Sequence, residues 1–507
     1  MHWLDVGVLV TYFGGLFAMG VWFSRRNVDV EEYFLGGRRF KGWVIGMSLV
    51  GTSISSITFL AYPGDAFKTA WLRFLPNLML PIAVVIAAYF FLPFFRRANT
   101  TTAFEFLEER FGPSIRVYGA IAFIVAQVVR VSLILYLISL VLQEITGFNA
   151  VWCIVIGGGV VAAYTILGGF SAVVWTDVIQ TIVLLAGGVV CLFIILLALP
   201  GGLSQLLDVA IADGKLAFSE LRAGELVPVG WNVGLSSKTA TMMLLVGLVS
   251  WLTEYSSNQN TVQRFCASRS DVEARKAMFI CAAVSVPTWA FFMFLGTALY
   301  VFFQVFPAPE ATEALNGVRK AEEILPFFVT GYLPPGLVGL VLAAVLAAAM
   351  SSTDSSINAI STVSINDIYQ RHLQPHASAV HYLRLAQIIA LAASLLMMGG
   401  AIVLTETDAK TLQDTATILT SLLGGGLLSI YLIGFFSRRG DARHVLFGIA
   451  GTMVFTGWTV LSANGLLPSS VVYPFDLYYT SFIGNVVMFV IVYGLSLLWS
   501  SQNKTGT

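Results

Sequence analysis

The sequence predicts an all-α polytopic membrane protein with about thirteen transmembrane helices in a single transmembrane domain, 1–507. The chain is 57% hydrophobic and 11% charged, with a mean hydropathy of +0.82, whereas a soluble domain carries about 25% charged residues. Apolar stretches of about 20 residues, the length that crosses a bilayer, recur along the whole chain. Lysine and arginine gather in alternate loops, which is typical of membrane proteins.

The apolar stretches define the predicted helices in order. The first lacks a basic start and a small-residue cleavage site, so we interpret it as a helix and not as a signal peptide. The predicted spans are 3–23, 43–63, 73–95, 117–146, 150–167, 172–199, 238–263, 277–305, 335–370, 380–404, 411–436, 443–463 and 478–499.

The basic residues predict the orientation. One set of alternate loops is far richer in Lys and Arg than the other, and we place it in the cytoplasm, with the N-terminus outside and the C-terminus inside. The richer loops include Arg38, Arg96, Arg264, Arg371 and Arg438. The long stretches 200–237 and 306–334 then lie outside, and the second is expected to form a short surface helix before Pro334 and Pro335.

Composition argues against several function classes. The net charge is zero, which gives no indication of nucleic-acid binding. The four cysteines show no pairing pattern, so we expect neither a disulfide nor a metal cluster. No nucleophile, base and orienting group converge, and the five histidines lie at the termini or in predicted loops, so we expect no enzyme.

Two predicted helices are interrupted by polar residues. The second contains GTSISSITF, and the seventh contains LTEYSSNQNTVQR. Each begins a block of five helices, 43–199 and 238–436, between the extra helix 3–23 and two C-terminal helices, 443–499. Broken helices at corresponding positions of two halves predict an inverted-repeat transporter with its site at the breaks. The alternative is that the polar residues only join helices to one another.

A polar run at 351–356, SSTDSS, follows small apolar residues inside the ninth predicted helix. Oxygen-bearing side chains at membrane depth are costly unless they bind something, and oxygen ligands without His or Cys suit a hard cation. Ala348, Ser351, Ser352 and Ser355 share one helix face. Unwound carbonyls near Gly51 and Ile54 would complete a site for Na⁺ or another weakly held cation. The alternative is a serine-rich packing face.

Two further charges lie in predicted helices. Asp177 is a carboxylate favoured by a helix N-terminus, a second cation ligand, or a partner for Asp354. Arg130 lies in the middle of its helix and needs an anion there. It either pairs with Glu254 or an aspartate, or clamps a substrate carboxylate.

The motifs FLGGRR, SISSITF, GGFSAVVWTDVIQ, NQNTVQR and MSSTDSSINAISTVSINDIY resemble those of the sodium/solute symporter family, from Tyr33 to about Arg439. The resemblance implies a LeuT-like core of two inverted five-helix repeats. It implies a shared sodium site formed by Gly51, Ile54, Ala348, Ser351 and Ser352. It also implies a second sodium site formed by Asp177, Ser351, Asp354 and Ser355.

The resemblance also implies the substrate residues, Ser53, Ser55, Thr58, Asn77, Arg130 and Gln259. Arg130 is similar to the arginine that binds the carboxylate of sialic acid in members of the family. The chain departs from the family at position 354, where the members compared have Ser or Thr. The acid there either tightens a second cation site or is protonated and couples transport to H⁺.

The sequence therefore predicts a transporter that couples Na⁺ to a small organic solute by alternating access, with sialic acid or another organic anion as the favoured substrate. A neutral-sugar symporter is the main alternative, and a transporter-like receptor is a further one. We expect a multi-pass protein of the bacterial inner (plasma) membrane that acts as a monomer, with a small-molecule substrate and the lipid bilayer as its partners.

Overall fold

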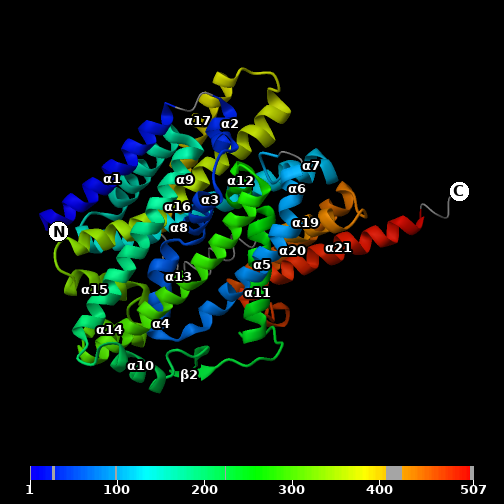
Figure 1. Ribbon diagram of the computed structural model, residues 1–507. Coiled ribbons are helices and arrows are strands. Elements are labelled where there is room, and N and C mark those ends of the chain that lie inside the picture. Colours follow the sequence, from blue (N-terminus) through cyan, green and yellow to red (C-terminus); the bar gives the residue numbers. More distant parts are fainter. Residues whose placement is uncertain (1, 26–28, 98–99, 223, 407–424, 503–507) are drawn as a thin grey trace.

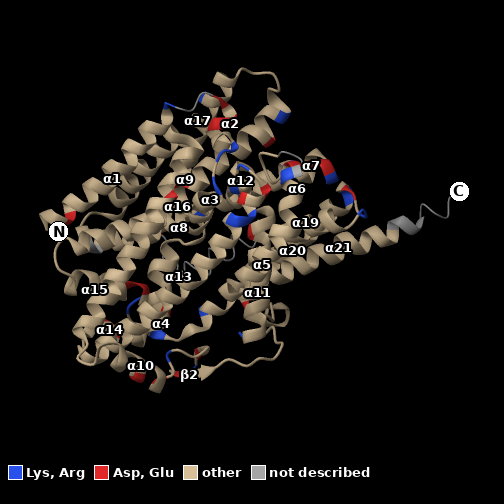
Figure 2. Cartoon of the chain, in the orientation of Figure 1, with Lys and Arg blue, Asp and Glu red and all other residues tan. Residues whose placement is uncertain are grey.

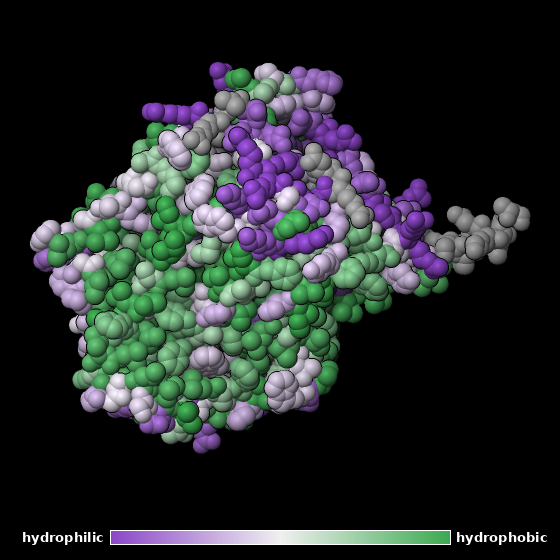
Figure 3. Space-filling model, in the orientation of Figure 1, coloured by the Kyte–Doolittle hydropathy of each residue, from purple (hydrophilic) through white to green (hydrophobic). Residues whose placement is uncertain are grey.

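A computed structural model describes residues 2–25, 29–97, 100–222, 224–406 and 425–502. The described chain is a bundle of long helices with a short hairpin at one end (Figure 1). Many large apolar side chains on the bundle surface are exposed, among them Val10, Phe193, Leu396 and Val454. Figure 3 shows a broad hydrophobic face below a hydrophilic end. An exposed apolar surface of this extent is expected where lipid replaces water as the solvent.

The helices follow one another along the described chain. The first half contains α1 (Trp3–Ser24), α2 (Val30–Leu35), α3 (Gly42–Ser53), α4 (Tyr62–Lys68), α5 (Leu80–Ile86), α6 (Leu92–Arg97), α7 (Glu105–Phe111), α8 (Pro113–Thr146), α9 (Ala150–Ala198) and α10 (Gly202–Ala212). The second half contains α11 (Ala240–Ser257), α12 (Gln259–Ala267), α13 (Asp271–Val305), α14 (Pro309–Asn316), α15 (Ile324–Tyr332), α16 (Leu337–Val363), α17 (Ala379–Thr405), α19 (Leu427–Phe436), α20 (Ala442–Ala463) and α21 (Thr480–Gln502).

Shorter turns complete the elements. The tight 3-10 turns are η1 (Gly36–Arg38), η3 (Trp71–Met79), η5 (Ala321–Glu323), η7 (Ser469–Val471) and η8 (Leu477–Tyr479), and the wider π-helical turns are η2 (Ile57–Ala61), η4 (Ala87–Phe91) and η6 (Ser364–Leu373). Strands β1 (Ser219–Arg222) and β2 (Glu225–Pro228) pair antiparallel, with Leu221 opposite Leu226.

The predicted and observed helices agree except in how they are divided. Nine described helices are long and apolar enough to cross a membrane, or ten if a bent pair counts as one span, so thirteen remains a prediction. Spans 150–167 and 172–199 form one continuous element, α9, which is broken only at Gly169 (φ 60°). Of the predicted span 411–436, residues 411–424 lie outside the described residues.

Two helices are broken where the sequence is polar. Helix α3 ends at Ser53, Ile54 is extended (φ −103°, ψ 113°), and the chain continues through η2 into α4 after a bend of 61°. Helix α11 ends at Ser257, Asn258 is extended (φ −82°, ψ 114°), and α12 follows. An unwound residue leaves backbone carbonyls free to bind a ligand inside the bundle.

The two ends of the bundle differ. Helices α10, α14 and α15 and the hairpin lie at one end, and α2, α6 and α7 lie at the other (Figure 1). Figure 2 shows charged residues gathered around the α2, α6 and α7 end. The helix expected before Pro334 is α15, which buries Ile324, Leu325 and Phe328 and leaves Tyr332 exposed.

Candidate functional site

The first broken helix and α16 meet at the shared sodium site predicted from the sequence. The hydroxyl of Ser351 on α16 donates to the carbonyl of Gly51 on α3 at 2.8 Å. Gly51 also packs against α9, because an added Cβ would lie 2.9 Å from Thr181 Oγ1 and 3.2 Å from the carbonyl of Asp177. The absence of a side chain at Gly51 therefore lets α3 lie close to α9, while its carbonyl bonds to α16.

The oxygens at this site fit a weakly held cation. Ile54, Ala348 and Ser352 are buried. The buried hydroxyl of Ser352 has no hydrogen-bond partner among the described residues, although buried polar groups are normally satisfied. A buried hydroxyl without a partner, next in sequence to the Ser351 hydroxyl that bonds the Gly51 carbonyl, fits a ligand of a hard cation.

The second predicted sodium site is organised differently from the expectation. The Asp177 carboxylate on α9 is fully buried and pairs with Arg264 on α12, with 2.6 Å between Oδ2 and Nη2. Ser48 also donates to Oδ2 at 2.5 Å. Asp354 was one partner considered for Asp177, and the structure pairs Asp177 with Arg264.

Arg264 is therefore the residue that sequence reasoning misplaced. It was expected in a cytoplasmic loop, but its exposed fraction is 1%. The predicted seventh helix ended at 263, whereas α12 continues to Ala267 after the break. The signal in the sequence was the motif NQNTVQR itself, because an arginine so close to a membrane break needs a carboxylate partner.

Asp354 on α16 faces α9 at another point. Its Oδ2 atom accepts hydrogen bonds from the Tyr164 hydroxyl at 2.6 Å and from the Thr176 hydroxyl at 3.3 Å. Its Oδ1 atom accepts a longer one, 3.4 Å, from Ser355. The acid that departs from the family pattern is thus bonded to hydroxyl groups, and no described basic residue lies within ion-pair distance of it.

The predicted substrate residues do not all face one space. Ser53 lies 3.9 Å from the Cys281 sulfur, Ser55 accepts from the Ile57 amide at 3.3 Å, and Thr58 is buried after the break. Asn77 donates to the Tyr62 hydroxyl at 2.8 Å.

Gln259 and Arg130 are placed by their own helices. The Gln259 side chain accepts from the Ala103 amide at 2.8 Å and donates to the Thr101 carbonyl at 3.0 Å, so it fastens α12 to the loop before α7 and does not face Ser53. Arg130 is half-buried on α8. Three residues before it on the same face, Gln127 accepts from Ser356 of α16 at 2.9 Å.

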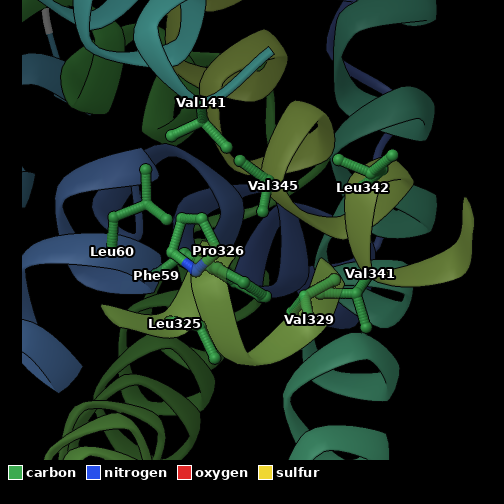
Figure 4. A pocket seen from close by; sticks show the side chains of 9 residues that line it. All are labelled: Phe59, Leu60, Val141, Leu325, Pro326, Val329, Val341, Leu342 and Val345. Atoms are coloured by element: carbon green, nitrogen blue, oxygen red, sulfur yellow. The ribbon is translucent and has the colours of Figure 1, made fainter. Parts of the chain in front are cut away.

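An apolar cavity adjoins the break in the first core helix. It is lined by Phe59, Leu60, Val141, Leu325, Pro326, Val329, Val341, Leu342 and Val345 and has a volume of about 10 Å³. Figure 4 shows these side chains, from η2, α8, α15 and α16, converging on one space. A volume of this size holds no more than about one water molecule. Hydrocarbon side chains thus pack the region between Thr58 and α15.

Comparison with known proteins decides the family. A model of the sodium:solute symporter family matches residues 33–451. The chain belongs to this family. It is therefore a sodium-coupled solute transporter of the membrane and not an enzyme.

Several relatives resemble this family member over most of its length. It is 30% identical over 452 residues to the "Sodium/sialic acid symporter SiaT" of Proteus mirabilis (strain HI4320), covering 89% of this chain and 88% of that protein. It is 27% identical over 481 residues to the "Sodium/glucose cotransporter" of Vibrio parahaemolyticus, covering 90% of this chain and 84% of that one.

Solved structures resemble the symporter as well. One, described as the "Substrate-bound outward-open state of a Na+-coupled sialic acid symporter", has a TM-score of 0.86, 27% identity and coverage of 98% of both chains. The nucleobase-cation-symport-1 transporter Mhp1, in a closed conformation, has a TM-score of 0.53 at 15% identity, covering 93% of this chain and 95% of that one. These likenesses confirm the predicted LeuT-like fold.

Proposed function

We propose that this symporter carries sialic acid, or another small organic anion, together with Na⁺ by alternating access. The placement of Arg130 is the observation that supports an anionic substrate. Arg130 lies within the apolar helix α8, and no carboxylate among the described residues lies within ion-pair distance of it. Glu254, the partner considered from the sequence, accepts from Asn258 at 2.7 Å and from Thr261 at 2.6 Å instead.

A guanidinium at membrane depth needs an anion, and its planar donor groups suit a carboxylate. The substrates named for two relatives differ in charge. The sialic acid symporter of Proteus mirabilis is named for an anionic sugar, and the glucose cotransporter of Vibrio parahaemolyticus for a neutral one. A neutral sugar therefore remains the alternative substrate for this chain. A transporter-like receptor is the further alternative.

For the coupling ion, we propose that Na⁺ binds to oxygens of Gly51, Ile54, Ala348, Ser351 and Ser352. An ion there would join the break in the first core helix to α16. Because Ser53, Ser55 and Thr58 lie in and just after that break, ordering it would also order the proposed substrate residues. Sodium and substrate would then raise each other's affinity by the same factor.

Substrate binding to the purified protein, measured by calorimetry with and without Na⁺, tests whether the substrate is an anion. Sialic acid is expected to bind in Na⁺, and glucose is not, while lactate tests whether a monocarboxylate suffices. Arg130→Ala should weaken sialic acid binding by at least about tenfold, since a charged hydrogen bond contributes about 1.5–3 kcal/mol. Arg130→Lys is the control that keeps the charge. Glucose binding, or unchanged sialic acid binding by Arg130→Ala, would contradict the proposal.

We further propose the placement of the chain in the membrane. The N-terminus lies outside and the C-terminus in the cytoplasm of a bacterial plasma membrane, where the protein acts as a monomer. The basic residues around α2, α6 and α7 support this orientation. Segments 43–199 and 238–436 are the two inverted repeats, and the two broken helices near their starts support this division.

A further inference from the structure

The guanidinium of Arg264 lies among the residues predicted to hold a second sodium ion. Its Nη2 atom donates to Asp177 Oδ2 at 2.6 Å and to Ser355 Oγ at 2.7 Å. Both oxygens belong to the predicted ligand set of that ion. A positively charged nitrogen therefore already lies between them.

Arg264 is held in this position from several sides. Its Nε atom donates to Ser48 Oγ of α3 at 2.8 Å, and its Nη1 atom donates to the Asn260 carbonyl of its own helix at 2.7 Å. The second broken helix, α12, is thereby joined through one side chain to α3, α9 and α16. Four hydrogen bonds fix the guanidinium in place, so it fills the position between these oxygens.

The charge balance at Asp177 disfavours a second ion beside Arg264. Asp177 supplies one negative charge, and Arg264 balances it at 2.6 Å. A sodium ion at the same oxygens would add a second positive charge to one buried carboxylate, where repulsion between cations is weakly screened. Asp354 turns its Oδ2 atom to Tyr164 and Thr176, and only its Oδ1 atom, 3.4 Å from Ser355 Oγ, lies toward these oxygens.

The site nevertheless keeps the means to bind an ion. Asp177 Oδ1 is buried and has no hydrogen-bond partner among the described residues. If the guanidinium were absent, this oxygen, Oδ2 and the Ser355 hydroxyl would form an oxygen cluster with one negative charge. That chemistry suits Na⁺.

We propose that Arg264 is a tethered cation that occupies the second site, and that a second Na⁺ enters only by displacing it. Arg264 thus determines how many sodium ions the symporter binds. This inference rests on the proposed shared site, which supplies the first ion. Because Arg264 belongs to α12, a movement of this half of the second broken helix would withdraw it from Asp177.

The test counts sodium ions by equilibrium binding of ²²Na⁺ to the purified full-length protein. The native protein is expected to bind one Na⁺ tightly. Arg264→Gln is expected to bind a second saturable Na⁺, or to bind a weaker second ion at least about tenfold more tightly. Arg264→Lys keeps the charge and is expected to bind a second Na⁺ more weakly than Arg264→Gln does. Equal number and affinity of Na⁺ in the native protein and in Arg264→Gln would overturn the proposal.

Two further variants keep the test decisive. Ser352→Ala should abolish or weaken binding of the first Na⁺, both in the native protein and in Arg264→Gln. If only this result fails, the assignment of the shared site is wrong and the role of Arg264 is not affected. Ser355→Ala in the native background covers the case in which Arg264→Gln does not fold. It should leave one bound Na⁺ if Arg264 fills the site, whereas loss of a second ion would show that Na⁺ and not Arg264 is the occupant.

Discussion

At the scale of single residues, Ser352 is the most informative position. Its hydroxyl is buried and unpartnered, whereas neighbouring hydroxyls on α16 are satisfied. Ser351 donates to Gly51, and Thr353 donates to the Ala349 carbonyl at 2.9 Å. A ligand role for Ser352 explains this difference within one helical turn.

Ser352→Ala is predicted to raise the sodium concentration that gives half-maximal uptake by about tenfold to a hundredfold. We expect the contact between this hydroxyl and the ion to be comparable to a hydrogen bond to a charged group, which contributes about 1.5–3 kcal/mol. Thr353→Val is the matched control, because it removes an adjacent hydroxyl that is bonded within its own helix. An unchanged half-saturation in Ser352→Ala, or an equal rise in both variants, would remove Ser352 from the site.

Some residues of the candidate site could be predicted from the sequence, and others could not. The hydroxyls of α16 and the glycine of α3 were predictable, because their spacing places them on a face and at a break. Arg264 was not, because loop and membrane positions were separated by hydropathy, and its own side chain lowers the hydropathy of α12. The bonds of Gln259 to Thr101 and Ala103 depend on a loop whose path has no local signal.

Among the helices, the break in α9 is made by a glycine. Hydropathy divided α9 into two spans, and the structure shows the reason at Gly169, where φ is 60° and ψ is −159°. A Cβ there would lie 2.8 Å from the Tyr33 ring and 3.0 Å from the Tyr33 carbonyl. The break brings α2 against α9, on the same long element that carries Asp177.

Gly169→Ala is predicted to lower the Tm of the purified protein markedly. The positive φ alone costs a residue with a side chain about 1–3 kcal/mol, and the contact with the Tyr33 backbone cannot relax without moving α2. Gly159→Ala, in the same element, is the control, since no atom lies within 4 Å of its added Cβ. Equal Tm values for the two variants, measured by differential scanning fluorimetry, would show that the break tolerates a side chain.

At the scale of the whole molecule, the two ends are fastened by different chemistry. Hydrocarbon side chains around the cavity of about 10 Å³ fill the space between η2 and α15. At the charged end, Arg116 pairs with Asp367 and Glu108, each at 2.6 Å, and Glu108 also pairs with Arg371 at 2.7 Å. Alternating access requires these ends to open in turn, and sequence alone predicted the ends but not their contacts.

Uptake of sialic acid into proteoliposomes under an imposed sodium gradient tests whether this symporter couples Na⁺ to an organic anion. An inward Na⁺ gradient is predicted to concentrate sialic acid inside the vesicles, and replacing Na⁺ with K⁺ on both sides is predicted to abolish this accumulation. An excess of glucose should leave uptake unchanged if the substrate is an anion. Sialic acid uptake at the same rate and to the same level without Na⁺, or no uptake of it under any gradient, would contradict the account.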